Sequence, residues 1–481
     1  MLGPSAAASV ASLFILNSAA RAADNEDAGM NVVVLVSDDH RWDGLGVAGN
    51  EEIHTPHLDR MANEGVRFSN AYVTTSICMT SRASILTGQY MSLHGIDRFG
   101  KQLSNEAFAK TYPALLRKAG YWTGFVGKYG VGSIRNDDFD FARAYEGVHW
   151  YDDPNEPGGR IHVTERNARD SLDFLRERPQ DRPFCLSVSY FAPHAEDRHE
   201  KQYLPQEWSA EYYEDGTIPL TWMVPLVDET ALERLPWFLS QDSNEGRVRY
   251  GWRFNTEEQY QRKMTDYFRL ITEVDEAVGR LIDELKEQGV YENTLIFFMG
   301  DNGYFYGERG LAGKWYPYEE SIRVPLLVHD PRLPESERGV VRDEMVLNID
   351  LAPAIVAAAG LPSPGVMQGK DLARLYLGDT PPAWREEFFY EHPTITNKDR
   401  IPTSEAVVRL DVKYAQWPEF EHEQLFDLTE DPYEIENLAD DPEYAALLDE
   451  MRGKLAEWRK TAASPLGKGN RSHDGLVIER Q

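Results

Sequence analysis

The chain has 481 residues, of which 42% are hydrophobic and 27% charged, enough for one large α/β domain and a smaller second one. Its formal net charge of −30 at pH 7 argues against nucleic acid or an anionic membrane as the main partner, because a strongly acidic surface repels both. The same charge means that any site for an anionic substrate must concentrate basic residues locally. The two cysteines, Cys78 and Cys185, give no disulfide framework.

The N-terminus is rich in alanine and other small or apolar residues, and Ala20-Arg21-Ala22 resembles a cleavage site for an export signal. We interpret residues 1–23 as a signal peptide, although the usual positive charges at its start are missing; a helix of the folded domain is the alternative. No later segment has the roughly 18 uninterrupted apolar residues of a membrane span. The sequence therefore predicts an exported protein, periplasmic or secreted, without a membrane span.

Residues 28–374 predict a large domain in which strands and helices alternate. It opens with the continuous β-branched run 30–36, typical of a parallel strand buried on both faces. Cys185, in a similar run, is interpreted as a small core residue. The segment 195–260 is rich in Pro, Trp, Tyr and acidic residues, so we expect an irregular excursion that helps to shape the substrate pocket. Further strands are expected at 122–127, 184–190, 294–299 and 325–329, and helices at 81–87, 112–119, 165–177, 263–288 and 349–359.

Residues 375–481 have a different texture and predict a smaller α+β region. Short β-type runs at 387–390, 406–414 and 424–428 precede a helix at 443–461. These elements suit a small antiparallel sheet with a helix on one face. The predicted fold class is therefore α/β: a large, mostly parallel mixed sheet flanked by helices, followed by a smaller antiparallel sheet and helix.

Polar residues follow two of the predicted strands directly. Asp38 and Asp39 come after the first strand, and Asp301 and Asn302 come after the strand at 294–299. Ligands of open α/β sheets bind at the carboxyl ends of strands, and carboxylate and amide oxygens suit a hard cation such as calcium or magnesium. Alone, the acidic pair is equally consistent with a helix cap, and Asp-Asn-Gly with a turn.

The run Cys78-Met79-Thr80-Ser81-Arg82, closed by Thr87-Gly88, is the most specific motif of the chain. It resembles the C-x-P-x-R…T-G signature of the type I, formylglycine-dependent sulfatase family, within the alkaline-phosphatase-like superfamily. The resemblance implies that a formylglycine-generating enzyme oxidises Cys78 to formylglycine (3-oxoalanine), the nucleophile, and that Arg82 holds its hydrate. Thr80 stands where the family usually has proline. The helix expected after residue 78 would offer backbone N–H groups to an anion.

The same resemblance assigns the polar strand ends to a metal site. It implies that Asp38, Asp39, Asp301 and Asn302, together with the modified Cys78, bind one divalent cation. Calcium is the expected ion and magnesium the alternative. These residues match the family's metal ligands in order and in context, which neither short pair would establish alone.

Three further elements resemble family motifs that contact the sulfate ester. Lys128 and Lys314 match the two sulfate-binding lysines, and His194 matches the histidine that protonates the departing alcohol. Lys314 could share that acid role. Gly130 stands where the family has a second histidine, the usual base for sulfate release, and Arg309 replaces another histidine. The resemblance therefore leaves the release step without an assigned base.

His40 and Arg41 follow the acidic pair directly and could face the substrate. We expect them either to bind substrate, with His40 substituting for the missing base, or to form a surface turn. Glu320 and Arg323 also lie in sulfatase-like sequence and are interpreted as structural. The resemblance extends from about residue 30 to 440.

The predicted activity is hydrolysis of sulfate esters, on a sulfated carbohydrate because sugars stack on aromatic rings such as those of 195–260. One alternative is a phosphonate monoester or phosphodiester hydrolase of the same superfamily, since relatives with this nucleophile act on phosphorus. The other is a non-catalytic binder of sulfated glycans, which Gly130 favours and which Thr80 would favour if it blocked maturation of Cys78.

Overall fold

The structure is a computed structural model that describes residues 29–462 except 136, 146–149, 154–158, 215–216, 222 and 379–382. The predicted signal peptide, residues 1–23, and the polar tail from residue 464 lie outside the described residues. Within the described part of the chain, no helix combines the length and the hydropathy that a membrane crossing needs.

The main sheet has eight strands in the order β13-β2-β12-β9-β1-β8-β4-β5. The central strand β1 pairs in parallel with β8 on one side and β9 on the other, whereas β12 runs antiparallel to β9 and β2. The predicted mixed, mostly parallel sheet is thus confirmed. The strands are β1 (Asn31–Ser37), β2 (Val66–Phe68), β4 (Trp122–Lys128), β5 (Phe141–Tyr145), β8 (Phe184–Ser189), β9 (Thr294–Gly300), β12 (Leu326–His329) and β13 (Val340–Arg342).

Both faces of this sheet are covered, which explains why β1 is apolar at every position. Val32 and Val34 belong to one hydrophobic core, and Val33 and Leu35 to the other, because successive side chains of a strand point to opposite faces. The first core is covered by α3 (Cys78–Thr87), α6 (Tyr112–Lys118) and α11 (Leu351–Ala358), and the second by α2 (Pro56–Asn63), α7 (Val163–Glu177) and α9 (Glu257–Glu287).

The excursion at 195–260 contains a helix that the sequence did not predict. Helix α8 (Glu245–Arg253) begins after Asn244, whose side chain accepts a hydrogen bond from the N–H of Gly246. Its buried face includes Arg253, which pairs with Asp197, so the helix is anchored by ion pairs and lacks an apolar stripe. The expectation of an irregular segment was therefore wrong for this stretch, and α9 also begins before the predicted residue 263.

The C-terminal sheet consists of β15 (Glu387–His392), β16 (Ser404–Arg409), β17 (Val412–Trp417) and β18 (His422–Asp427), all antiparallel in sequence order. Helix α12 (Ala445–Thr461) packs on one face of this sheet, where the ring of Trp458 stacks on that of Phe389 with 6.2 Å between the ring centroids. The single run predicted at 406–414 was wrong, because the chain reverses at Leu410-Asp411 between two strands. Continuous β-type composition concealed this turn.

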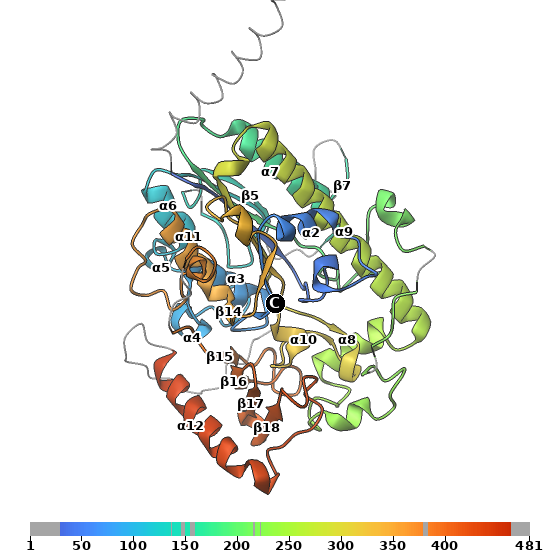
Figure 1. Ribbon diagram of the computed structural model, residues 1–481. Coiled ribbons are helices and arrows are strands. Elements are labelled where there is room, and N and C mark those ends of the chain that lie inside the picture. Colours follow the sequence, from blue (N-terminus) through green and yellow to red (C-terminus); the bar gives the residue numbers. More distant parts are fainter. Residues whose placement is uncertain are drawn as a thin grey trace, which may run out of the picture.

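The remaining elements are short, and all but β14 lie between strands of the main sheet along the chain. In Figure 1 the C-terminal sheet and α12 lie below α3 and α10 (Glu319–Ile322). The other short elements are α4 (Met91–His94), α5 (Asn105–Phe108), β3 (Ala71–Tyr72), β6 (Asp152–Asp153), β7 (Ile161–His162), β10 (Phe305–Tyr306), β11 (Ala312–Gly313) and β14 (Val346–Leu347).

Candidate active site

The predicted functional residues meet at the carboxyl ends of the central strands. Asp38 follows β1, Asp301 follows β9, and Lys128 is the last residue of β4. Cys78 is the first residue of α3, which begins at the same edge. All four side chains are buried. Parallel strands place their carboxyl ends together, and this brings residues more than 200 positions apart into one cluster.

Asp38 is surrounded by cations. The ammonium group of Lys128 donates a hydrogen bond to its Oδ2, and Nη2 of Arg82 lies 3.3 Å from the same oxygen. Burial by itself would raise the pKa of Asp38, but Lys128, Arg82 and Lys314 outweigh burial and lower it to about 2. Asp38 is therefore ionised at every physiological pH.

Asp39 is held on the other side of the cluster. Its backbone is left-handed, with φ 61°, and its N–H donates to Oδ1 of Asp301 at 3.1 Å. Its Oδ1 accepts a hydrogen bond from Nδ2 of Asn302 at 2.6 Å and one from Lys314. A non-glycine residue in this conformation costs energy, and such residues concentrate at functional sites. In this backbone conformation the Asp39 carboxylate contacts Asn302 and Lys314.

Arg82 connects the helix of the cysteine motif to three strand ends. Its Nε donates to Oδ2 of Asp301 at 2.8 Å, and its Nη1 donates to the carbonyl of Lys128 at 2.8 Å and to Oγ of Ser189. Burial and the neighbouring Asp38 raise the pKa of Asp301 to about 7, although Arg82 opposes them. Arg82 thus fixes the cluster and neutralises part of its negative charge.

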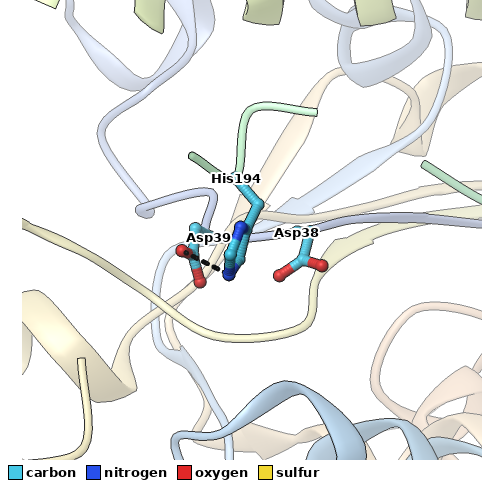
Figure 2. Close-up of side chains that lie close together, drawn as sticks. All are labelled: Asp38, Asp39 and His194. Atoms are coloured by element: carbon cyan, nitrogen blue, oxygen red, sulfur yellow. Dashed lines mark ion pairs between the residues drawn. The ribbon is translucent and has the colours of Figure 1, made fainter. Parts of the chain in front are cut away.

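The donor set fits a divalent cation bound by oxygen. Oδ1 of Asp38 and Oδ1 of Asn302 are buried and have no hydrogen-bond partner among the described residues. Buried polar atoms without a partner are rare, and an ion is one of the groups that satisfies them. Asp38, Asp39 and His194 offer ligand atoms that all lie within 4.8 Å of one another (Figure 2). Hard oxygen ligands of this kind suit calcium or magnesium.

His194 lies beside the acidic pair, in the loop after β8. Its Nδ1 is 2.7 Å from the carbonyl of Ala195, and its Nε2 is 3.7 Å from Oδ2 of Asp39, the contact dashed in Figure 2. Because a carbonyl only accepts, Nδ1 carries a proton and Nε2 is the nitrogen that exchanges one. Tyr151 donates to the backbone carbonyl of His194 at 2.6 Å and so holds this loop in place.

Cys78 itself is a poor nucleophile as a thiol. It is 3% exposed, and burial raises the pKa of its thiol even though Lys128 and Lys314 lie nearby. Thr80, which departs from the family motif, points away from this site: its hydroxyl donates to the carbonyl of Ile96 at 2.8 Å.

The structure places His40 and Arg41 beside the cluster, with their polar atoms bonded within the protein. The two ring nitrogens of His40 lie 2.9 Å from Oγ of Ser37 and 2.8 Å from the carbonyl of Gly44. Arg41 pairs with Asp43 and Glu308, both at 2.6 Å. Their predicted role in substrate binding stays a prediction.

Gly130 packs directly against Arg82. A Cβ atom added there would lie 2.9 Å from Cδ of Arg82, and the residue has φ +75°. A side chain at this position would therefore displace Arg82 and adopt strained backbone geometry. The histidine that the family carries here has no equivalent at this point of the structure.

Sequence reasoning missed two residues that position the cluster. Ser189 accepts a hydrogen bond from Arg82, and the hydroxyl of Tyr267 donates to the backbone carbonyl of Asp39 at 2.5 Å. The place of Ser189 at the end of a predicted strand was a usable signal. Tyr267 gave none, because a tyrosine on a long amphipathic helix is typical of core.

The excursion at 195–260 lines a cavity of about 810 Å³, formed by residues 201 and 203–208 with Asp152, His162 and Asp266. None of the clustered residues above belongs to this lining. The predicted contribution of the excursion to the substrate pocket therefore stays a prediction.

Two protein-family models match the chain. The model described as Sulfatase matches residues 30–361, more than half of the chain. The model described as N-sulphoglucosamine sulphohydrolase, C-terminal, matches residues 307–461, including the C-terminal sheet and α12. The predicted resemblance is confirmed in both regions.

Two relatives extend over nearly the whole chain. The arylsulfatase of Clostridium perfringens is 30% identical over 93% of this chain and 98% of the relative. The N-acetylglucosamine-6-O-sulfatase of Bacteroides thetaiotaomicron is 27% identical over 89% of this chain and 86% of the relative.

Solved structures agree with the fold. A structure described as a complex with its substrate, D-glucosamine-2-N,6-O-disulfate, has a TM-score of 0.73 and 26% identity, and covers 90% of this chain and 98% of that one. The phosphonate monoester hydrolase of Agrobacterium radiobacter has a TM-score of 0.75 at 21% identity, covering 90% of this chain and 96% of that one, which is a likeness of fold alone.

Proposed function

This chain belongs to the sulfatase family, and from that premise we propose that it hydrolyses a sulfate ester on a sulfated carbohydrate and releases inorganic sulfate. The observation that carries the proposal is the position of Cys78 at the N-terminus of α3, buried beside Arg82, Lys128 and Lys314. Three buried cations around one small side chain form a site for an anionic group in an otherwise acidic protein. The sugar-directed names of relatives support a carbohydrate substrate.

We infer that Cys78 acts only after oxidation to formylglycine, and that Asp38, Asp39, Asp301 and Asn302 hold a divalent cation, calcium or magnesium, beside it. The buried thiol with its raised pKa favours a modified nucleophile, and the two oxygens without hydrogen-bond partners favour the cation. Hydrated formylglycine would supply a nucleophilic oxygen, and the cation would supply positive charge next to it.

Lys128, Lys314 and His194 bind the sulfate ester and protonate the leaving group. Lys128 and Lys314 bind the oxygens of the sulfuryl group and stabilise its charge in the transition state. The pKa of Lys314 is raised, because Asp39 and the other anions outweigh burial. A lysine that holds its proton so firmly serves better as a fixed charge than as an acid. Nε2 of His194, next to Asp39, therefore gives the proton to the departing alcohol.

Arg82 holds the residues of the cluster in position, because it contacts Asp301, Lys128 and Ser189 at the same time. The base for sulfate release has no assignment, since Gly130 carries no side chain. His40, adjacent to the acidic pair, keeps its proposed role as a substitute base or substrate contact. We further propose that the protein is exported by a signal peptide at residues 1–23, and that a formylglycine-generating enzyme is its maturation partner.

The proposal is tested by mass spectrometry of the peptide containing residue 78, followed by sulfate-release assays. The protein is produced in a host that carries a formylglycine-generating enzyme. Mature protein is then assayed against glucosamine sulfates, other sulfated sugars and 4-methylumbelliferyl sulfate. We expect formylglycine at position 78 and sulfate release from at least one sugar.

The same assay separates the alternatives. Faster hydrolysis of a phosphonate monoester or phosphodiester than of every sulfate ester would assign the chain to the second reaction class. Unmodified Cys78 in the native host, with sulfated sugars bound but never cleaved, would support a non-catalytic binder. Either outcome would overturn the proposed hydrolysis of sulfate esters.

A further inference from the structure

The end of strand β15 packs against the catalytic edge of the main sheet, which is the edge where Asp38, Cys78 and Lys128 meet. The N–H of Glu391 donates to the carbonyl of Thr74 at 3.0 Å, in the segment that leads into Cys78. The hydroxyl of Tyr390 donates to the carbonyl of Trp315 at 2.7 Å, directly after Lys314. The C-terminal sheet therefore reaches both segments that carry the proposed chemistry.

The alternation of side chains along β15 shows which face points toward the site. On one face, the ring of Phe388 packs on that of Tyr72 with 5.2 Å between the ring centroids, and Tyr390 contacts Trp315. On the other face, Phe389 stacks on Trp458 of α12. Side chains two apart on a strand share a face. His392 therefore shares the face of Phe388 and Tyr390, the one turned to the catalytic edge.

His392 is buried with few polar neighbours among the described residues. It is 1% exposed, and among the described residues neither ring nitrogen has a hydrogen-bond partner of good geometry; the backbone of the next residue, Pro393, is the polar group beside the ring. Ser404 lies opposite it in the β15–β16 register, is fully buried, and likewise has no partner for its hydroxyl. Directly opposed residues of antiparallel strands project from the same face. Two adjacent buried polar groups without partners are costly unless a ligand satisfies them.

The chemistry of this pair differs from that of the charged cluster. Burial lowers the pKa of His392 to about 3, with the nearby Lys314 acting in the same direction and the Pro393 backbone opposing. The ring is therefore neutral at pH 7 and offers one donor and one acceptor. A sugar hydroxyl both donates and accepts a hydrogen bond, so it matches a group that offers one donor and one acceptor. A sulfuryl anion is bound instead by positive charge, such as that of Lys128 and Lys314.

We propose that His392, with Ser404 beside it, binds a hydroxyl group of the sugar that carries the sulfate ester, and so determines specificity. The inference rests on the proposed sulfatase function and names a substrate contact that comes from the C-terminal sheet. His392 and Ser404, which are neutral, bind the sugar hydroxyl, and the charged cluster around Cys78 binds the sulfate group.

The test compares His392→Ala and His392→Gln with the wild type on two substrates. One is the sulfated monosaccharide that the wild type cleaves fastest, and the other is 4-methylumbelliferyl sulfate, which has no sugar hydroxyl. We expect His392→Ala to lower kcat/KM on the sugar by about 10-fold or more, mainly through KM, and to lower it on the aryl sulfate by no more than about 3-fold. His392→Gln should recover part of the sugar activity, because its amide keeps a donor and an acceptor.

A matched control is His329→Gln, which changes another buried histidine at the far end of β12 and should affect both substrates equally little. Circular dichroism and thermal melting establish that each variant folds. An equal loss on both substrates, or no loss on the sugar, would overturn the assignment of His392. Should the wild type release sulfate from nothing, the proposed function fails. Calorimetric binding of D-glucosamine-2-N,6-O-disulfate to wild type and His392→Ala still decides the role of His392, since equal affinities would overturn it.

Discussion

Two buried clusters of ion pairs use the same residue types for different ends. The active-site cluster contains Asp38, Asp39, Asp301, Arg82, Lys128 and Lys314. The interface cluster contains Glu319, Glu320, Glu434, Arg309 and Lys413, where Lys413 contacts Glu319 at 2.8 Å and Glu434 at 2.7 Å. Each cluster balances three acids against a comparable number of bases.

The clusters differ in what they join. The active-site cluster gathers around Cys78 at one edge of the main sheet. In the interface cluster, Lys413 belongs to β17 of the C-terminal sheet and Glu319 to α10, and Nη1 of Arg309 donates to the carbonyl of Glu434 at 2.9 Å. It therefore ties the C-terminal sheet to the segment that carries Lys314. Substitutions in the first cluster should cost activity, and substitutions in the second should cost stability.

The largest effect on the active-site side should come from Cys78→Ala. Without the precursor of the nucleophile, sulfate release should fall by roughly 10⁴-fold or more on every substrate, while the melting temperature changes little. The control is Cys185→Ala in β8, which changes the chain's other cysteine and should keep its activity. Retention of more than a few per cent of activity by Cys78→Ala would exclude residue 78 as the nucleophile.

Asp301→Asn should remove the proposed cation. We expect one divalent ion per wild-type chain by elemental mass spectrometry and far less in the variant, with activity reduced by about 10³-fold, because a bound cation contributes several kcal/mol to the transition state. Asp330→Asn changes a buried aspartate that pairs with Arg332 after β12, and should leave the metal content unchanged. Equal metal content in all three proteins would contradict the assigned ligands.

Lys314→Ala should lower kcat/KM by about 10²- to 10³-fold on sugar and aryl sulfates alike, because it removes charge aimed at the sulfuryl group. The measurement is steady-state kinetics on both substrates. A loss confined to the sugar would instead place Lys314 with the residues that recognise the sugar.

Lys413→Met should give the opposite pattern. Removing one partner of a buried ion pair should lower the free energy of unfolding by about 3–5 kcal/mol, since Glu319 and Glu434 would lose their shared cation. Activity per folded molecule should stay within about 3-fold of wild type. Lys454→Met, which breaks the partly exposed pair with Glu387, should cost about 1 kcal/mol or less. Denaturant titration measures both, and similar costs would remove the contrast between the sites.

The smallest effect concerns pH and Glu320. Burial raises the pKa of this carboxyl from 4.5 to about 7, against the opposing Arg309 cation. The folded protein therefore keeps a proton that the unfolded chain loses near pH 4.5, and stability declines as pH rises from about 4.5 to about 7. Glu320→Gln cannot ionise, so its melting temperature should decline less between pH 5 and pH 8. Equal declines in both proteins would show that Glu320 does not contribute to this pH dependence.

Much of the site followed from local patterns. The abrupt change from β-branched to acidic residues after 30–36 located Asp38 and Asp39 at a strand end, and the same pattern located Asp301 and Asn302. The arrangement of Cys78 and Arg82 pointed to one nucleophile motif. Such patterns can be recognised in the sequence because the burial of a strand and the start of a helix depend on the types of adjacent residues.

Other features have no local signature. Helix α8 lacks an apolar stripe because ion pairs anchor it, and the turn at Leu410-Asp411 lies inside composition typical of one strand. Tyr267 and His392 resemble ordinary core residues until the contacts with the Asp39 carbonyl and with the neighbours of β15 are seen. Their roles depend on what packs against them.

The sequence by itself determined the alternating α/β architecture, the strand ends that carry acids and amides, and the motif around Cys78, since each is encoded within a few consecutive residues. Only the tertiary structure decided that Arg82 spans three strand ends, that Lys413 is buried beside Glu319 of α10, and that His392 shares the face of β15 turned to the catalytic edge. The reason is physical. Burial and electrostatic coupling depend on distances between segments that are remote in the chain, and packing alone sets those distances.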